Sequence, residues 1–196
     1  MSSPATVPLP ARAADEGGAA SVGSPAAVSD EASDIPRPER PDFSPGYGLG
    51  GKDHDTASLP WPAVLDRLRN SRNYWITTVR DDGRPHAMPV WGVLLDHTVL
   101  FSTDAASVKG RNLQARPDCV LHLESGDDVV IVEGRASRVT DPALLPRFVE
   151  AYLEKYEITV DVANPAFSVF AVSPRSVLGW LEADFVATAT RWRVAS

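Results

Sequence analysis

The chain has 196 residues, 43% of them hydrophobic, and a formal net charge of -7. Its length and composition suit one soluble domain plus a tail, and no apolar run approaches the ~20 residues of a membrane span. The acidic balance argues against nucleic acid as the main partner, because phosphate binding needs a basic face.

The first segment, residues 1–41, is rich in Ala, Pro, Ser, Gly and acidic residues and has no hydrophobic period. Such a sequence buries too little apolar surface to offset its ordering entropy, so we predict a disordered tail. It lacks the basic stretch and apolar core of a secretory signal, and the single Cys119 has no internal disulfide partner. We therefore expect a protein of the reducing cytoplasm.

Residues 42–58 form a Gly-rich lead-in in which Gly46 to Lys52 nearly matches a phosphate-binding loop. We reject that interpretation, because no strand precedes the motif and Asp53 stands where a metal-binding hydroxyl is required. Residues 1–55 hold four basic and nine acidic side chains, and the remainder holds 15 and 17. The predicted domain, 59–196, is therefore nearly neutral and leaves room for a local anion pocket.

The domain is predicted to begin with a short amphipathic helix ending near Asn70, with Ser58 as its cap. Aromatic and β-branched runs then predict strands over 74–79, 84–95 and 99–103, the first two joined by an Asp-Asp-Gly turn. Pro85 and Pro89 remove ladder donors from the second strand, so we expect it to be an edge strand or bulged.

A helix over 107–116 follows, with Ser107 as a candidate cap. The remaining segments predict a hairpin over 119–124 and 129–139, a helix over 141–156 opened by Asp141 and Pro142, and strands over 167–172 and 191–194. Hairpins interrupted by single helices make a parallel nucleotide-binding fold improbable. We predict a mostly β (α+β) fold, a closed or half-closed antiparallel barrel of six to seven strands with a few short helices.

Several motifs occur in a characteristic order along residues 73–140. They are Asp-Gly-Arg-Pro-His-x-x-Pro-Val-Trp (Asp82 to Trp91), Leu-Phe-Ser-Thr (Leu100 to Thr103), Ser-x-Lys-x-Arg-Asn-Leu (Ser107 to Leu113), Pro117 and Val-Glu-Gly-x-Ala (Val132 to Ala136). This region resembles the pyridoxamine 5'-phosphate oxidase-like split β-barrel family. The C-terminal stretch from Phe185 to Arg193 resembles members thought to use the deazaflavin coenzyme F-420.

This resemblance implies an oxidoreductase that passes hydride between reduced coenzyme F-420 and an unsaturated small molecule, in a groove between two barrels of a homodimer. The sequence departs from true pyridoxamine phosphate oxidases, since Met88 stands near the position of their FMN-phosphate arginine and their C-terminal Arg-x-x-x-Arg stretch is missing. FMN as the cofactor, and a non-catalytic flavin- or deazaflavin-binding protein, remain the alternatives. Haem binding is recorded for related barrels, but this sequence shows no evident His or Cys placed to serve as an axial ligand of haem iron.

The candidate anion site lies where the third strand leads into the 107–116 helix. A helix N-terminus favours negative charge, while Lys supplies a point charge and Arg a bidentate fork. In the resembling family this segment holds the cofactor phosphate, and an ordinary solvated helix face is the alternative. The residues are Ser102, Thr103, Ser107, Lys109, Arg111 and Asn112.

The candidate ring site is the second strand, which the family places against its ring system. A planar ring needs apolar walls, and a proline leaves neighbouring backbone free to meet a ligand. The residues are Met88, Pro89, Val90 and Trp91, and a bulged edge strand with Trp91 in the core is an equal alternative.

Three further residues are kept as lining candidates for the substrate or the cofactor tail: His86, Arg191 and Arg193. Arg191 and Arg193 should share one face of the last strand, with Trp192 on the other. We assign no catalytic residue, because the cofactor brings the reactivity in hydride transfer. His54, His97 and His122 show no metal spacing with Cys119 or with each other, so no metal site is predicted.

Overall fold

The computed structural model describes residues 36–41, 44, 46 and 59–194. Residues 1–35 of the tail predicted over 1–41, the Ser58 cap and nearly all of the lead-in over 42–58 lie outside these residues. The structure differs from the predicted tail at β1 (Arg37–Glu39), a three-residue strand that pairs with the C-terminal strand β9 (Thr190–Arg193). This short segment has no hydrophobic period, so its pairing could not be read from local sequence.

The described residues form an antiparallel sheet with short helices, which confirms the predicted fold class. The other strands are β2 (Tyr74–Val79), β3 (Pro85–Val90), β4 (Gly92–Leu95), β5 (Thr98–Asp104), β6 (Asp118–His122), β7 (Asp128–Arg138) and β8 (Phe167–Leu181). The helices are α1 (Trp61–Asn70), α2 (Val108–Ala115), α3 (Leu144–Tyr156) and α4 (Phe185–Thr188), with a 3-10 turn, η3 (Glu182–Asp184), before α4. None of the helices in this described part is long and apolar enough to cross a bilayer.

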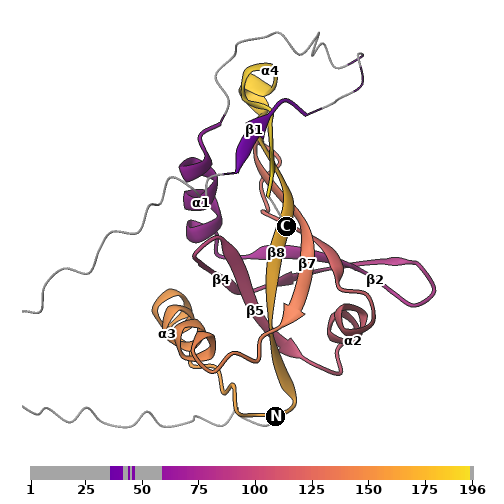
Figure 1. The fold of residues 1–196 in the computed structure, drawn as a ribbon, viewed down its shortest axis with the longest axis vertical. Helices are drawn as coiled ribbons and strands as arrows, with labels where there is room; N and C mark the ends of the chain where they lie inside the picture. Colours follow the sequence, from indigo (N-terminus) through magenta and orange to yellow (C-terminus); the bar gives the residue numbers. More distant parts are fainter. Residues whose placement is uncertain (1–35, 42–43, 45, 47–58, 195–196) are drawn as a thin grey trace, which may run out of the picture. The chain divides into compact units, whose positions relative to one another are not determined.

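The sheet divides between β3 and β5, and this division positions the site. Its main path runs β1-β9-β8-β7-β6-β2-β3, while β4 leaves the path and pairs with β5, which pairs with β8 (Figure 1). The chain passes from β3 to β4 through Trp91 alone. Among the described residues β3 pairs only with β2, so the predicted edge position of the proline-bearing strand is confirmed.

Two strand predictions need correction. The single strand predicted over 84–95 is two strands that turn at Trp91 and pair with different partners. The strand predicted over 167–172 continues through Pro174 to Leu181. A register shift between Glu133 and Gly134 of β7 accommodates this proline, and a Cβ on Gly134 would lie 2.4 Å from the carbonyl oxygen of Ser173. With the division of 84–95 and the addition of β1, the described sheet has nine strands instead of six or seven.

The helices begin slightly later than predicted. Helix α1 starts at Trp61 with Pro60 at the N-cap position, where no side chain caps the helix. Helix α3 starts at Leu144, because Asp141 uses its carboxylate to accept from the Ala143 N–H at 2.8 Å and so organises a turn before the helix. Helix α2 matches its prediction, including Ser107 as the cap.

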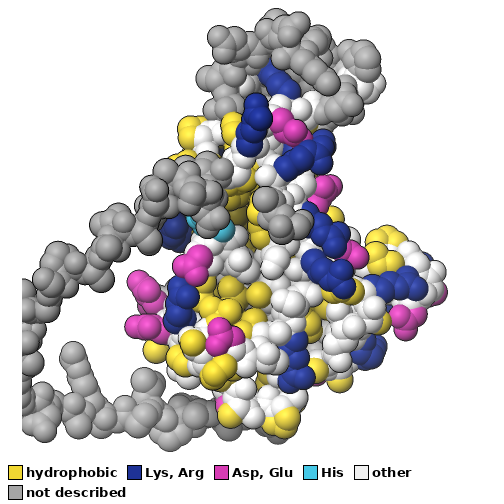
Figure 2. All heavy atoms as spheres, in the orientation of Figure 1, with side chains coloured by type: hydrophobic (Ala, Val, Ile, Leu, Met, Phe, Trp, Pro, Cys, Tyr) yellow, Lys and Arg dark blue, Asp and Glu magenta, His cyan; other side chains and the backbone are white. Residues whose placement is uncertain are grey.

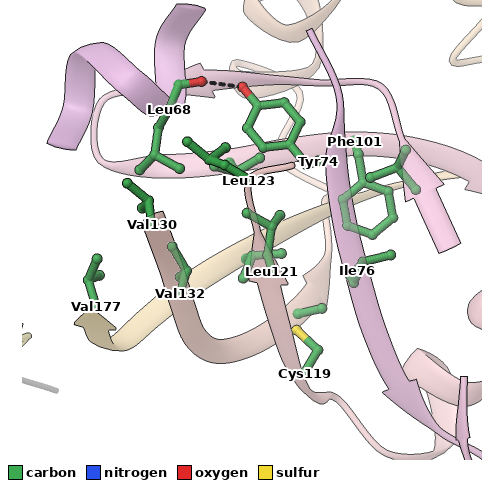
Figure 3. Close-up of a cluster of buried hydrophobic side chains, with 14 of the residues drawn as sticks. Leu68, Tyr74, Ile76, Phe101, Cys119, Leu121, Leu123, Val130, Val132 and Val177 are labelled. Carbon is green, nitrogen blue, oxygen red and sulfur yellow. Dashed lines mark hydrogen bonds between the residues drawn. The ribbon is translucent and has the colours of Figure 1, made fainter. Parts of the chain in front are cut away.

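The core consists of two hydrophobic clusters. Alternate residues of β2, among them Tyr74 and Ile76, point into the larger cluster beneath α1, where the Tyr74 hydroxyl donates to the Leu68 carbonyl (Figure 3). The smaller cluster lies beneath α3, where Phe148 and Leu100 are almost completely buried. Figure 1 shows α3 beside β4 and α2 on the other side of the sheet's lower half.

Candidate functional site

A pocket of about 450 Å³ opens at the division of the sheet. It is bounded by the end of β3, the far end of β5, α2, α3, the start of β2 with the residue before it, and the segment just after β6. The lining side chains are Asn73, Trp75, Pro89, Val90, Trp91, Ser102, Lys109, Glu124 and Tyr152.

The pocket brings together the two groups of residues that the sequence had placed apart. Pro89, Val90 and Trp91 supply one side, while Ser102 and Lys109 come from β5 and α2. Nothing in β3 itself pairs with β5, and this gap in the ladder is what leaves room between them. A cation and hydroxyl therefore face the same space as an apolar strand.

Local bonds fix α2, which carries Lys109. Ser107 Oγ accepts from the Gly110 N–H at 3.1 Å, and Thr103 Oγ1 lies 3.2 Å from Ser107 Oγ. A Cβ on Gly110 would lie 2.5 Å from the carbonyl oxygen of Asp104, so only glycine permits this approach of helix and strand. Ser107 and buried Thr103, both predicted as ligands of an anion, thus hold the helix start instead of lining the pocket.

Asn112 ties α2 to the β2–β3 hairpin. Its Nδ2 donates to Thr78 Oγ1 at 2.9 Å, and Thr78 Oγ1 donates to the His86 carbonyl at 3.3 Å. Asn112 and Thr78 are buried, so this amide is a link between elements and does not line the pocket. The link holds Lys109 at a fixed place relative to β3.

His86 lies in a cationic environment near α2. Partial burial lowers its pKa first, and the positive charges of Arg80 and Lys109 lower it further. Its Nδ1 atom is buried and has no hydrogen-bond partner among the described residues. His86 does not line the pocket, but an anion near Lys109 would relieve the repulsion that its imidazolium form meets.

The remaining predicted residues lie away from the pocket lining. The Arg111 guanidinium donates to the Ala106 carbonyl on the exposed side of α2, and the Met88 side chain is 42% exposed. Arg193 Nε donates to Glu39 Oε1 at 2.7 Å, and Arg191 shares its face, while Trp192 is buried as the alternation predicts.

Basic side chains continue along this margin of the sheet toward α2 (Figure 2). Arg193 lies opposite Arg37 of β1 in the register. On its other side it lies opposite Ser176 of β8, the residue that follows Arg175. Arg191 and Arg193 therefore remain candidates for the tail of an anionic ligand without being part of the pocket.

Sequence reasoning missed four lining residues. Asn73 Nδ2 donates to Glu124 Oε2 at 3.1 Å, and Trp75 stacks on His122 with ring centroids 6.4 Å apart. Strand alternation places Asn73 and Trp75 on one face, which was a usable signal. Tyr152 comes from α3, far along the chain, and no local pattern pointed to it.

The arrangement suits a planar anionic ligand. Its volume falls within the range of about 300–1,000 Å³ that is typical of small-molecule sites. The tryptophans and Tyr152 offer aromatic walls, and Lys109 offers a cation. Within the described residues, no three His, Cys, Asp or Glu side chains are grouped as a metal site would require.

The comparisons with known proteins agree with this fold. Among solved structures, a conserved hypothetical protein from Mycobacterium tuberculosis is 24% identical, with a TM-score of 0.57 over 66% of this chain and 88% of its own. General Stress Protein 26 from Bacillus anthracis is 22% identical, with a TM-score of 0.51 over 60% of this chain and 91% of its own. A heme binding protein from Mycobacterium smegmatis is 19% identical, with a TM-score of 0.51 over 66% of this chain and 62% of its own.

These identities establish likeness of fold alone. No curated protein sequence matches the chain. A family model described as pyridoxamine 5'-phosphate oxidase matches residues 61–181, which is more than half of the chain and includes every strand of the pocket. The resemblance predicted from the sequence motifs is thereby confirmed, and the chain belongs to the pyridoxamine 5'-phosphate oxidase family.

Proposed function

We propose that the chain is an oxidoreductase that binds a phosphorylated ring cofactor, coenzyme F-420 before FMN, in the pocket at the division of the sheet. The observation that carries this proposal is the meeting of Lys109 and Ser102 with Pro89, Val90 and Trp91 around one space. The substrate would be an unsaturated small molecule that stacks over the ring.

The cationic side of the pocket supports an anionic group on the ligand. Lys109 is a point charge with three donors, and the Ser102 hydroxyl adds another donor. Arg80 and Lys109 also repel protonated His86, so positive potential gathers near this end of α2. A phosphate there would be attracted by Lys109 and would offset that repulsion.

The aromatic side supports a planar ring. Trp75, Trp91 and Tyr152 line the same space, and stacking on such rings is worth about 0.5–1.5 kcal/mol beyond simple burial. Pro89 has no N–H to donate to a ladder, and among the described residues β3 pairs only with β2, so backbone groups on its other edge could meet a ligand. The lining residues would therefore orient the ring and exclude water from one of its faces.

When bound, the reduced flavin or deazaflavin supplies the hydride that the substrate accepts. The chain's own residues need only hold and orient the two molecules, so no acid or base is assigned. Preference for coenzyme F-420 rests on the resemblance of the stretch from Phe185 to Arg193. FMN fits the same cation and ring walls, and a binding protein without turnover would use them equally.

Haem is a further ligand to consider, because one of the similar structures is named for binding it. Among the described lining residues there is neither His, Cys nor Met, and Tyr152 alone could serve as an axial ligand. We therefore regard haem as a weaker candidate ligand than either coenzyme F-420 or FMN.

We also propose a homodimer in which a second copy covers β3. This strand pairs only with β2 among the described residues, and Pro85, Ala87, Met88 and Pro89 along it are exposed. Figure 2 shows hydrophobic side chains among the charged ones on the projecting β2–β3 hairpin. An open edge with apolar residues is a surface that proteins usually cover.

Native mass spectrometry after incubation of the full chain with coenzyme F-420 and FMN together tests the proposal. We expect a dimer whose added mass equals one coenzyme F-420 per chain. Retention of FMN in its place supports the alternative cofactor, and a chain that retains neither contradicts cofactor binding. Turnover is then measured with the loaded protein on enone, quinone and tetrapyrrole acceptors, and binding without turnover on all of them supports the non-catalytic alternative.

A further inference from the structure

The junction between β3 and β4 is held by α3 through the backbone of Gly92. This residue directly follows Trp91, which lines the pocket. Its carbonyl oxygen accepts from Lys155 Nζ at 3.0 Å and lies 2.7 Å from the Tyr156 hydroxyl. Its N–H donates to the same hydroxyl oxygen at 2.9 Å. Both polar backbone groups of Gly92 are therefore bound by two consecutive residues of α3.

Only glycine fits at this junction. A Cβ on Gly92 would lie 2.8 Å from the carbonyl oxygen of Leu100 and 3.4 Å from the Tyr74 ring. The close approach allows α3 to reach the backbone just beyond the point where the chain leaves β3. The grip on Gly92 thus acts at the joint that separates the two strands.

The same helix residue that binds Gly92 also contacts the pocket wall. The ring of Tyr156 stacks on the ring of Trp91, with centroids 5.0 Å apart and planes 5° apart. The Tyr156 hydroxyl lies 2.7 Å from the Arg72 carbonyl, and the Arg72 guanidinium lies 5.4 Å from the Trp91 ring centroid. Trp91 is therefore fixed by its backbone neighbour and by its ring at the same time.

We propose that Lys155 and Tyr156 are positioning residues that clasp the Gly92 backbone and thereby set the orientation of the Trp91 wall of the pocket. We call this group of contacts the α3 clasp. The inference deepens the proposed function, on which it rests for the identity of what Trp91 contacts.

The clasp contains one group that changes charge near neutral pH. Lys155 Nζ also donates to the Tyr74 hydroxyl at 2.9 Å and lies 4.8 Å from the Tyr74 ring centroid and 5.4 Å from that of Tyr156. Burial lowers the pKa of Lys155 to about 8. Its ammonium form is therefore predominant at pH 7 and is lost within the next two pH units.

The groups that face Lys155 do not titrate in this range. Burial raises the pKa of Tyr156 to about 12 and also raises the pKa values of Tyr74 and Tyr152. Arg72 supplies a permanent cation. Loss of the Lys155 charge removes the cation–π contacts and weakens the hydrogen bond to Gly92, so Trp91 should respond to pH through Lys155.

Fluorine NMR of the chain labelled with 5-fluorotryptophan tests the clasp without any ligand. The Trp91 resonance is assigned by its loss in Trp91→Phe. We expect it to shift with a single midpoint near pH 8, and to lose that shift in Lys155→Met, which keeps the length of the side chain without its charge. A Trp91 resonance that does not move between about pH 7 and about pH 9.5 overturns the proposal.

Two further variants serve as a control and as an independent test of this result. Glu154→Gln removes the charge of the neighbouring, exposed α3 residue and should leave the Trp91 titration in place with at most a small change of midpoint; loss of the titration in this variant would contradict Lys155 as its source. Tyr156→Phe keeps the stacked ring but removes the hydroxyl that binds Gly92, so the Trp91 resonance should move at pH 7. An unmoved resonance in that variant also contradicts the clasp, even if Lys155→Met fails to fold.

Binding of FMN or coenzyme F-420 supplies the functional readout. The wild-type affinity should fall as the pH rises through about 8, while Lys155→Met should bind roughly three- to tenfold more weakly at pH 7 and show no such step. An affinity step of equal size in Lys155→Met contradicts the positioning role. If the wild-type chain binds neither cofactor, the proposed function fails, and the fluorine titration still decides whether the clasp exists.

Discussion

At the scale of single residues, residue chemistry together with the family motifs identified the cation but not all of its surroundings. Lys109 and Ser102 line the pocket as expected, whereas Arg111 faces away and bonds the Ala106 carbonyl. Lys109 and Arg111 lie on the same short helix, and the sequence does not show how that helix is rotated about its axis. Thr103, Ser107 and Asn112 were recognised as polar residues of the segment, yet their hydrogen bonds hold the helix in place.

His86 provides a residue-scale test of the positive potential near Lys109. Partial burial and the charges of Arg80 and Lys109 lower its pKa from the ordinary value of 6.5. Lys109→Ala should therefore raise the pKa of His86, and saturating inorganic phosphate should raise it in the wild-type protein. The measurement is an NMR titration of the His86 ring, assigned with His86→Asn.

The lowered pKa of His86 also determines how the free energy of unfolding changes with pH. The unfolded chain holds the His86 proton more tightly than the folded protein, so protonation favours unfolding. The free energy of unfolding should increase as pH rises from the lowered folded pKa through 6.5, and His86→Asn should lose that increment. A His86 pKa that is unchanged in Lys109→Ala would contradict the electrostatic contact between them.

At the scale of elements, the start of α2 decides where the cation stands. Ser107 caps the helix, and Gly110 lets it approach β5. Ser107→Ala should lower the free energy of unfolding by about 1 kcal/mol, because the Gly110 N–H loses its acceptor. Urea denaturation measures this loss.

Ser107→Asn is the matched control, since asparagine caps helices as well as serine does. It should lie within about 0.5 kcal/mol of the wild-type protein. Equal stability of Ser107→Ala and the wild-type chain would show that the cap does not hold α2.

Element boundaries were predictable where a local pattern decided them and not where a distant partner did. The alternation in β2 and the cap of α2 were sufficient to predict both elements. The turn at Trp91 depends on the pairing of β4 with β5, and the length of β8 depends on the register shift at Gly134 of β7, which lies opposite Pro174. Local sequence predicts one strand through Pro85 and Pro89 and another that ends at residue 172, and only the pairing shows that the first divides at Trp91 and that the second continues past Pro174.

At the scale of the whole molecule, the fold class followed from the order of hairpins and helices, whereas the pocket did not. Its walls come from β2, β3, β5, the segment after β6, α2 and α3, and Tyr152 lies 43 residues beyond Lys109 in the sequence. Motifs in a known order located the residues of β3 to α2. The α3 wall could be found only from the folded chain.

Assembly belongs to the same scale. If a second copy covers β3, Met88→Glu should weaken the dimer at least about tenfold, because it would bury an unpaired charge. Leu153→Glu is the control, since Leu153 on α3 is 47% exposed, comparable with Met88. Sedimentation equilibrium measures both variants.

A wild-type chain that sediments as a monomer would contradict the homodimer. A dimer that Leu153→Glu disrupts while Met88→Glu does not would place the interface on α3 instead of β3.

The central claim is that Lys109 holds the phosphate of a ring cofactor, and paired affinities test it most directly. Dissociation constants are measured for FMN and riboflavin, and for coenzyme F-420 and its phosphate-free deazaflavin chromophore, with wild-type protein, Lys109→Ala and Arg111→Ala. We expect Lys109→Ala to weaken the phosphorylated ligand about 10- to 100-fold, consistent with about 1.5–3 kcal/mol for a charge-assisted bond, and to leave its phosphate-free counterpart nearly unchanged. Arg111→Ala should have little effect on either, and equal binding of the phosphorylated ligand by Lys109→Ala and wild-type protein would contradict the claim.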